Sequence, residues 1–160
     1  MRGLRGSSAG FAAEVWGVEL FKYNHVADLW PLNPKGELIY GVKIEDTYAD
    51  QQVEGTLALP GLAMAEWGPG DHSYWLYGLD IFPEDGSRMD VTDRPEMQHV
   101  RQTVLDLCKQ HNIKFLNAGN TNPNSSTYII TQLQQGAMVI EAGEPVAIVG
   151  REYSKRKMPV

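Results

Sequence analysis

The feature that most constrains the fold is a repeated alternation between segments typical of strands and segments typical of helices. Four short apolar segments, bounded by Gly, Pro or polar residues, favour strands. Helix-starting signals or helical spacing of apolar residues follow each of them. The expected strands are residues 37–45, 62–67, 113–119 and 137–142, and the expected helices are residues 46–59, 93–111, 125–135 and 145–157. This order predicts an α/β fold with a parallel sheet, because each crossover must return along the sheet to start the next strand.

The clearest helix is expected at residues 93–111. Asp93 and Glu96 form a capping-box pattern, and Pro95 suits the first turn of a helix. The apolar residues that recur at helical spacing are Met97, Val100, Val104, Leu107 and Cys108. The helix at 125–135 has a serine at its start and a glycine directly after its end, which are also capping signals.

Two segments fall outside this alternation. Residues 12–30 contain one helical piece within the irregular region before the first strand. Residues 68–92 combine glycines, prolines and several acids, which predicts a long loop. Loops of that length are usually functional or disordered.

Composition and charge limit the class of protein. The 160 residues predict one domain, 1–160, because a domain usually takes roughly 100–200 residues. A net charge of −6 argues against a nucleic-acid partner, which needs a basic surface. No apolar run reaches ~18 residues, so no membrane span is expected. The single cysteine, Cys108, is predicted to be a buried apolar residue, and the reducing cytoplasm is the expected compartment.

Four βα units fit two architectures. One is a small open, doubly wound sheet. The other is half of a (β/α)8 barrel, which takes about 250 residues when complete. A nucleotide-binding domain of the flavodoxin type would need a Gly-rich loop after the first strand, and residues 45–52, EDTYADQQ, offer none. Both architectures place functional residues at the C-terminal ends of the strands.

Two carboxylates stand at such strand ends. Glu45 ends the first strand, and Asp71 lies just past the second, 26 residues later. Hard oxygen ligands with open positions suit Mg2+ or Mn2+. Gly68 and Gly70 allow close backbone approach, so the amide groups of Gly70 and Asp71 could hold an anionic carboxylate. An ordinary turn, with Asp71 as a cap and Glu45 in a surface ion pair, remains the alternative on spacing alone.

These segments resemble the HpcH/HpaI aldolase/citrate lyase family, the metal-dependent pyruvate aldolases. VKIED (42–46) and LPGLAMAEWGPGDHSYWLYG (59–78) resemble the family's strand ending in Glu and its "GPxD" stretch. DRPEMQHVRQTVLDLCKQHNIKF (93–115) resembles its "hPEvq" helix and the strand after it. QLQQGAMVIEAGEPVAI (132–148) resembles its last strand and loop, and RGLRG (2–6) its "RGxRG" loop.

The resemblance implies the C-terminal half of a (β/α)8 barrel. It implies reversible aldol cleavage of a 2-oxoacid such as pyruvate, through an enolate, with an aldehyde as the second substrate. Glu45 and Asp71 correspond to the ligands of a divalent metal, Mg2+ or Mn2+ and possibly Co2+. Gly68, Gly70 and the backbone of Asp71 correspond to the site of the substrate carboxylate.

The chain departs from the family pattern at three points. The family's enolate-stabilising Arg and catalytic His lie upstream of the segments matched here and have no counterpart. His72 replaces the family's Leu, and we expect a solvent-facing loop residue there, with a ligand or proton carrier as the alternative. Lys43 replaces a Gln and should point the same way as Glu45, because side chains alternate along a strand. It could contact a substrate oxygen as a catalytic residue, form an ion pair with Glu45 or a neighbouring acid or, least favoured, form a Schiff base.

The sequence therefore predicts a carbon–carbon lyase of which this chain supplies the metal-binding half. A half barrel leaves open sheet edges, so a homo-oligomer or a complementary N-terminal half is the expected partner. The alternative is a catalytically incomplete remnant that binds metal or 2-oxoacid without turnover.

Overall fold

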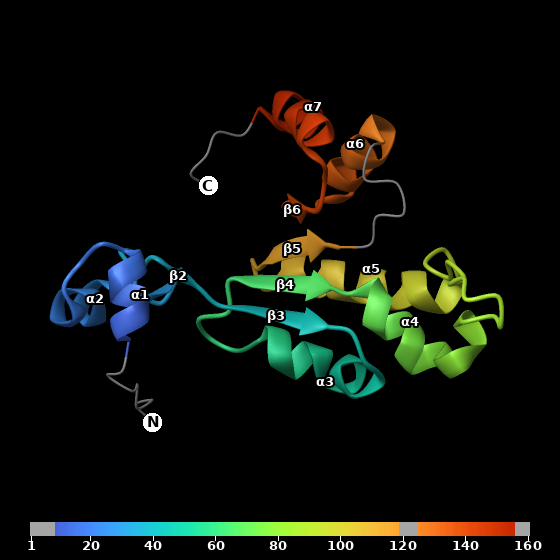
Figure 1. Cartoon of the computed structure of the whole chain (residues 1–160), viewed down its shortest axis with the longest axis horizontal. Coiled ribbons are helices and arrows are strands. Elements are labelled where there is room, and N and C mark those ends of the chain that lie inside the picture. The colour runs from blue at the N-terminus through green and yellow to red at the C-terminus, as the bar shows by residue number, and fades with distance from the viewer. Residues whose placement is uncertain (1–8, 119–124, 156–160) are drawn as a thin grey trace.

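The computed structural model describes residues 9–118 and 125–155. Its centre is a four-stranded sheet in the order β3-β4-β5-β6, with every pair parallel (Figure 1). The strands are β3 (Gly41–Ile44), β4 (Met64–Trp67), β5 (Lys114–Asn117) and β6 (Val139–Ile140). Sheet neighbours are also consecutive in sequence, so each crossover leads to the adjacent strand. The predicted α/β fold with a parallel sheet is confirmed.

The helices that follow these strands are α3 (Thr47–Leu57), α4 (Pro69–Tyr77), α5 (Pro95–Gln110), α6 (Ser126–Gln135) and α7 (Glu144–Ser154). A short 3-10 helix, η1 (Gly78–Ile81), continues α4. The arrowheads of β3 and β4 point towards α4, which therefore lies at the C-terminal edge of the sheet (Figure 1). Within residues 9–118 and 125–155, no helix has the length and apolar character needed to cross a membrane.

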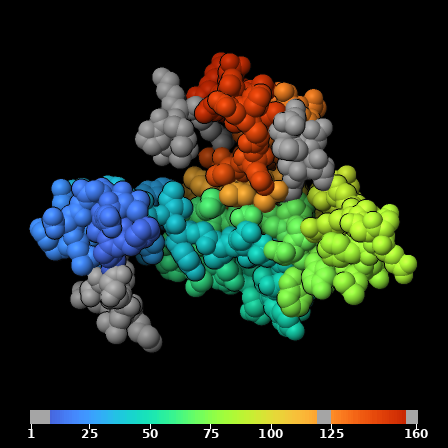
Figure 2. Space-filling model, viewed as in Figure 1, coloured from blue at the N-terminus to red at the C-terminus, as the bar shows by residue number. Residues whose placement is uncertain are grey.

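The prediction of a loop over residues 68–92 is wrong for its first half. Pro69 takes the first position of α4, where its fixed φ favours a helix and its missing N–H is not needed. The Gly-Pro-Gly pattern is therefore a helix start rather than an irregular hinge. In the space-filling view, α4 and the segment after it (green to yellow-green) form one end of the molecule (Figure 2).

The region before β3 also differs from its prediction. The single helix expected within residues 12–30 is two helices, α1 (Gly10–Val15) and α2 (Leu20–Val26), because Gly17 adopts a φ of 64° and ends the first. The strand expected at 37–45 is also divided. Its first part is β2 (Leu38–Ile39), which pairs in parallel with β1 (Leu29–Trp30) in a separate sheet. These elements lie at the opposite end from α4 (Figures 1 and 2).

The start of α5 differs in a smaller way. Pro95 opens the helix as expected, but Arg94 is the N-cap residue and makes no side-chain cap hydrogen bond. A residue before proline is driven to extended backbone, and Arg94 has φ −65° and ψ 144°. Asp93 therefore lies one position too early, and the predicted capping box is wrong. At α6 both expected capping signals are confirmed. Ser125 Oγ accepts a hydrogen bond from Tyr128 N at 3.2 Å, and Gly136 adopts the left-handed backbone conformation after the helix.

The core lies between the sheet and the helices that cover one of its faces. In β4, Ala65 and Trp67 are fully buried against the helices, while Met64 and Glu66 alternate onto the other face and are less buried. Cys108 of α5 is in this core, as predicted. The main buried members are Ile44, Leu57, Trp67, Met97, Val104, Leu105, Cys108 and Phe115.

Three predicted segments reach beyond the described residues. The RGLRG stretch at 2–6 lies wholly outside them. The expected strand 113–119 extends beyond them at residue 119, and the last expected helix extends beyond them at residues 156 and 157.

Candidate metal centre

The structure places Glu45 directly beside Gly68. Ile44, the last residue of β3, is paired with Trp67, the last residue of β4, so Glu45 and Gly68 leave the sheet at the same level. The backbone N–H of Gly68 donates to the carbonyl of Ile44 at 3.3 Å. A Cβ built on Gly68 would lie 3.1 Å from Cβ of Glu45 and would collide with its carboxylate. Only glycine allows this approach without moving Glu45.

Asp71 lies three residues beyond Gly68, in the first turn of α4, and is exposed. An acid in the first helical turn is favoured, because the unpaired N–H groups there carry partial positive charge. The fold thus brings the Glu45 carboxylate against the N-terminal end of the helix that carries Asp71. Both side chains lie at the C-terminal edge of neighbouring parallel strands.

Lys43 forms ion pairs on the sheet face away from the helices. Its Nζ lies 3.3 Å from Glu45 Oε2 and 3.5 Å from Glu66 Oε1, and Glu66 is its register partner on β4. The hydrogen bond that Lys43 donates to Glu45, followed by the charges of Glu66 and Glu45, raises the pKa of Lys43. The ion-pair alternative is therefore the one observed. A charged amine is not a nucleophile, which argues further against a Schiff base.

Glu66 is a site residue that sequence reasoning missed. The signal was available in principle, because the alternation that places Ala65 and Trp67 in the core puts Glu66 on the opposite face. What the sequence lacks is the register between β3 and β4, which aligns Glu66 with Lys43.

Arg88 is a second missed residue. Its Nη2 donates to the carbonyl of Gly70 at 2.5 Å and to Ser73 Oγ at 2.8 Å. Ser73 Oγ itself donates to the Gly70 carbonyl at 2.7 Å. The guanidinium also lies over the ring of Phe82, at 5.5 Å from its centroid. The segment after η1 therefore folds back onto the first turn of α4 and places a cation beside Gly70, a contact that no sequence spacing indicated.

His72 is fully buried, so the prediction of a solvent-facing loop residue is wrong. The reason is that residues 69–77 form a helix, whose first turn directs position 72 towards α3 rather than outwards. Its Nε2 lies 2.9 Å from Oδ2 of Asp50. Among the described residues, His72 Nδ1 and Asp50 Oδ1 are buried without a hydrogen-bond partner.

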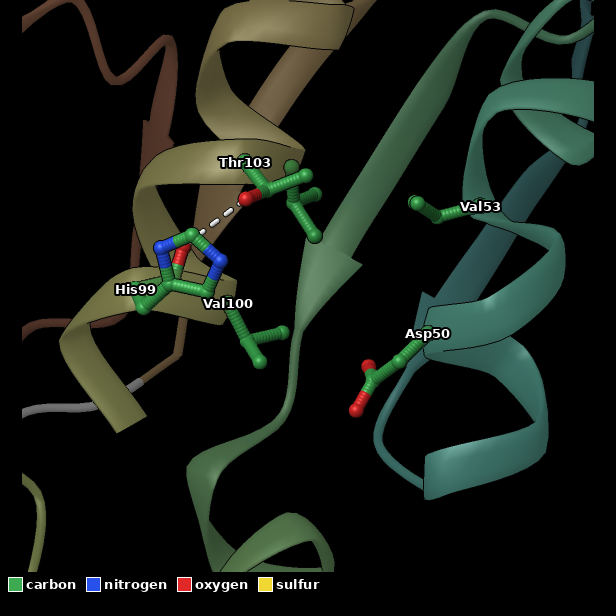
Figure 3. A pocket seen from close by; sticks show the side chains of 6 residues that line it. Asp50, Val53, His99, Val100 and Thr103 are labelled. Atoms are coloured by element: carbon green, nitrogen blue, oxygen red, sulfur yellow. Dashed lines mark hydrogen bonds between the residues drawn. The ribbon is translucent and has the colours of Figure 1, made fainter. Parts of the chain in front are cut away.

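A small cavity of about 130 Å3 lies between α3 and α5. Figure 3 shows Asp50 and Val53 of α3 facing His99, Val100 and Thr103 of α5 across it; Val104 completes the lining. The Thr103 hydroxyl donates a 2.9 Å hydrogen bond to the carbonyl of His99. Neither Glu45 nor Asp71 lines this cavity, so it is separate from the carboxylates at the strand ends.

The carboxylates present suit a hard divalent cation. Mg2+ is usually held by one or two carboxylates and keeps several waters or substrate oxygens. In the described part of the chain, no three His, Cys, Asp or Glu side chains are grouped closely enough to hold a metal. Gly68, which lacks a side chain, leaves room for the Glu45 carboxylate itself.

Solved structures with a similar fold include proteins of the HpcH/HpaI aldolase/citrate lyase family. An HpcH/HpaI aldolase/citrate lyase family protein from Burkholderia cenocepacia J2315 is 18% identical, with a TM-score of 0.59 over 97% of this chain and 51% of that chain. The HpcH/HpaI aldolase from Desulfitobacterium hafniense DCB-2 is 17% identical, with a TM-score of 0.56 over 96% and 50%. At these identities the likeness shows a shared fold, and at that level the resemblance found in the sequence is confirmed.

A third structure carries ligands. Protein CitE from Mycobacterium tuberculosis, in complex with magnesium and pyruvate, is 19% identical, with a TM-score of 0.52 over 74% of this chain and 49% of that chain. The chain thus spans about half the length of the solved proteins that it matches. No protein-family model matches the sequence, and no curated protein matches it at a significant level.

Proposed function

We propose that this chain is the metal-binding half of a carbon–carbon lyase. The reaction is aldol cleavage or condensation between a 2-oxoacid of the pyruvate type and an aldehyde, and it depends on a divalent metal. One observation carries the proposal: Gly68 lets the Glu45 carboxylate lie against the N-terminal end of the helix that bears Asp71. The fold shared with an HpcH/HpaI aldolase/citrate lyase family protein and with the CitE complex with magnesium and pyruvate supports it.

Glu45 and Asp71 would hold Mg2+ or Mn2+, which when bound polarises a keto oxygen and offsets developing negative charge. Gly68, Gly70 and the backbone of Asp71 would receive the substrate carboxylate at the start of α4, where free N–H groups favour an anion. Lys43 would hold Glu45 in place through its ion pair and lie close to any substrate oxygen bound beside that carboxylate.

The sheet would form the C-terminal half of a (β/α)8 barrel. Its four strands are parallel and consecutive, as in such a barrel, and β3 and β6 lie at its two edges. A second copy of the chain or a complementary N-terminal half would cover these edges and supply the general base. We place the enzyme in the cytoplasm, where the free, buried thiol of Cys108 is stable.

The test is exchange of the methyl protons of pyruvate into D2O, followed by NMR with and without Mg2+. Exchange requires bound pyruvate, metal and a working base together. We expect exchange that needs the metal and is lost in Asp71→Asn and Glu45→Gln, while circular dichroism shows both variants folded.

Two other results would change the conclusion. Pyruvate binding that needs metal but gives no exchange would identify a catalytically incomplete form that binds without turnover. If Asp71→Asn and Glu45→Gln both retained metal-dependent pyruvate binding, the assignment of the site would be wrong.

A further inference from the structure

We propose that the pair of buried His72 and partly exposed Asp50 is a positioning element that fixes where the two metal-binding carboxylates lie relative to each other. This inference rests on the proposed function, because it concerns the same metal site. Neither residue is assigned to metal or substrate. The pair acts through the segments that carry Glu45 and Asp71.

Asp50 is coupled to Glu45 through a rigid segment. Helix α3 begins two residues after Glu45, and Asp50 lies in its first turn. Asp46, the N-cap residue, fixes this start by accepting hydrogen bonds from Tyr48 N at 2.8 Å and Ala49 N at 2.7 Å. Between Glu45 and Asp50 the backbone is therefore held by the cap and the first helical turn.

His72 is coupled to Asp71 even more directly, as the next residue of α4. Its imidazole is fully buried, and its Nε2 lies 2.9 Å from Asp50 Oδ2. Figure 3 shows Asp50 projecting from α3, and α3 and α4 are in contact. The hydrogen bond therefore links His72, the residue after Asp71, to α3, the helix that begins after Glu45. The Gly68–Glu45 approach is the second link between the same two segments.

The pair is poorly explained by packing alone. Burying an imidazole and a carboxylate costs more than burying apolar groups, unless every polar atom is satisfied. Here His72 Nδ1 and Asp50 Oδ1 are buried and lack hydrogen-bond partners among the described residues. A buried polar pair that contributes little to stability can still favour one arrangement of the segments that carry it over other arrangements. An orienting role at the carboxylates accounts for that cost.

The geometry also excludes a direct role in ligation. His72 has no exposed surface, and the nitrogen facing α3 is occupied by Asp50. A group that touches neither metal nor substrate acts only through what it holds. Removing outer-shell partners of metal ligands typically lowers metal affinity by about 10- to 100-fold.

The experiment measures Mn2+ affinity by electron paramagnetic resonance of the free ion, on the full chain, below the Tm of each variant. His72→Leu keeps an apolar body of similar size but removes the hydrogen bond. His72→Gln keeps a donor that can reach Asp50. The control is Val146→Ala in α7, a helix that packs against α6; it leaves a cavity away from both links and lowers Tm.

We expect Mn2+ affinity to fall about 10- to 100-fold in His72→Leu, and to stay within about threefold of wild type in His72→Gln and Val146→Ala. Unchanged affinity in His72→Leu would overturn the proposal. So would a loss of affinity that follows Tm equally in all three variants, because that is a purely structural effect. If His72→Leu does not fold, Asp50→Ala breaks the pair from its partly exposed side and carries the same expectation.

Failure of the proposed function gives a different result. In that case the wild-type chain itself binds no Mn2+, or Asp71→Asn binds it as tightly as wild type, which overturns the metal site and the positioning role together. Wild-type binding that is lost in Asp71→Asn but kept in His72→Leu overturns the positioning role alone.

Discussion

The carboxylate of Glu45 occupies the space that a side chain on Gly68 would need. The two residues leave neighbouring strands at the same level, and the N–H of Gly68 is bonded to the residue before Glu45. The glycine therefore does more than form a turn. It allows the end of β3 and the start of α4 to approach closely, with the Glu45 carboxylate between them.

Gly68→Ala should lower Mn2+ affinity at least about tenfold, because the new methyl group must displace the Glu45 side chain, and a tenfold loss corresponds to only about 1.4 kcal/mol. Isothermal titration calorimetry with Mn2+ checks this. The matched control is Gly55→Ala in α3, where a Cβ meets nothing within 4 Å. It should leave Mn2+ binding unchanged and stabilise the helix by about 0.5–1 kcal/mol. Equal Mn2+ affinity in the two variants would contradict the role given to Gly68.

Lys43→Met should raise Mn2+ affinity, because the ammonium group competes with the cation for Glu45. Lys43 is half exposed, so the gain should be modest, roughly two- to fivefold. Glu66→Gln should have the opposite effect, since it leaves Lys43 with Glu45 as its main partner. Competition between Mn2+ and a fluorescent chelator measures both. Lys114→Met in β5 controls for the change in net charge, and an equal gain in that variant would show a general charge effect rather than competition at Glu45.

The strand–helix alternation predicted the sheet well because parallel strands and crossover helices leave strong periodic signals. Segment ends were less predictable. Gly68-Pro69-Gly70 has the composition of a turn, and only the packing of α4 against its neighbours makes it a helix start. At Gly17 the opposite happened, since one glycine in a left-handed conformation divided an expected helix.

The carboxylates were predictable because strand ends can be read from the sequence. Glu66 and Arg88 were not, since each depends on a contact between distant segments, a strand register in one case and a returning loop in the other. His72 shows the same limit. Its helical position was missed, and so was its burial against Asp50, 22 residues earlier in the chain.

Alkaline pH should destabilise the fold partly through Cys108. Burial raises the pKa of this thiol from 9.0 to about 12. The folded state therefore keeps a proton that the unfolded chain loses, so this contribution to stability is complete below pH 9 and declines as the pH rises from 9 towards 12. The decline should be about 1 kcal/mol at pH 10. Urea unfolding at pH 8 and pH 10 measures it.

Cys108→Ala is the control for this pH effect. It should cost stability at both pH values through its small cavity. However, its free energy of unfolding should fall less between pH 8 and pH 10 than that of the wild type. Identical pH dependence in the two proteins would show that the thiol is accessible in the folded state.

Arg101 is a buried cation held by neutral acceptors. Its Nε donates to Asn117 Oδ1 at 2.8 Å, and its Nη2 donates to Gln135 Oε1 at 2.8 Å and to Gln132 Oε1. Burial lowers its pKa, and no carboxylate forms an ion pair with it among the described residues. The guanidinium fork therefore joins α5 to β5 and α6 by hydrogen bonds rather than by charge pairing.

Arg101→Lys keeps the positive charge but cannot reach all three acceptors, so one or more buried amide oxygens lose their donor. We expect a loss of about 1–3 kcal/mol in the free energy of unfolding, measured by urea denaturation. Arg94→Lys is the matched control, since Arg94 is exposed and its guanidinium lies over the ring of Tyr77, at 4.5 Å. That variant should stay within about 0.5 kcal/mol of wild type. Equal losses in the two variants would show a general effect of replacing Arg by Lys, and would contradict the role given to the hydrogen-bonding fork of Arg101.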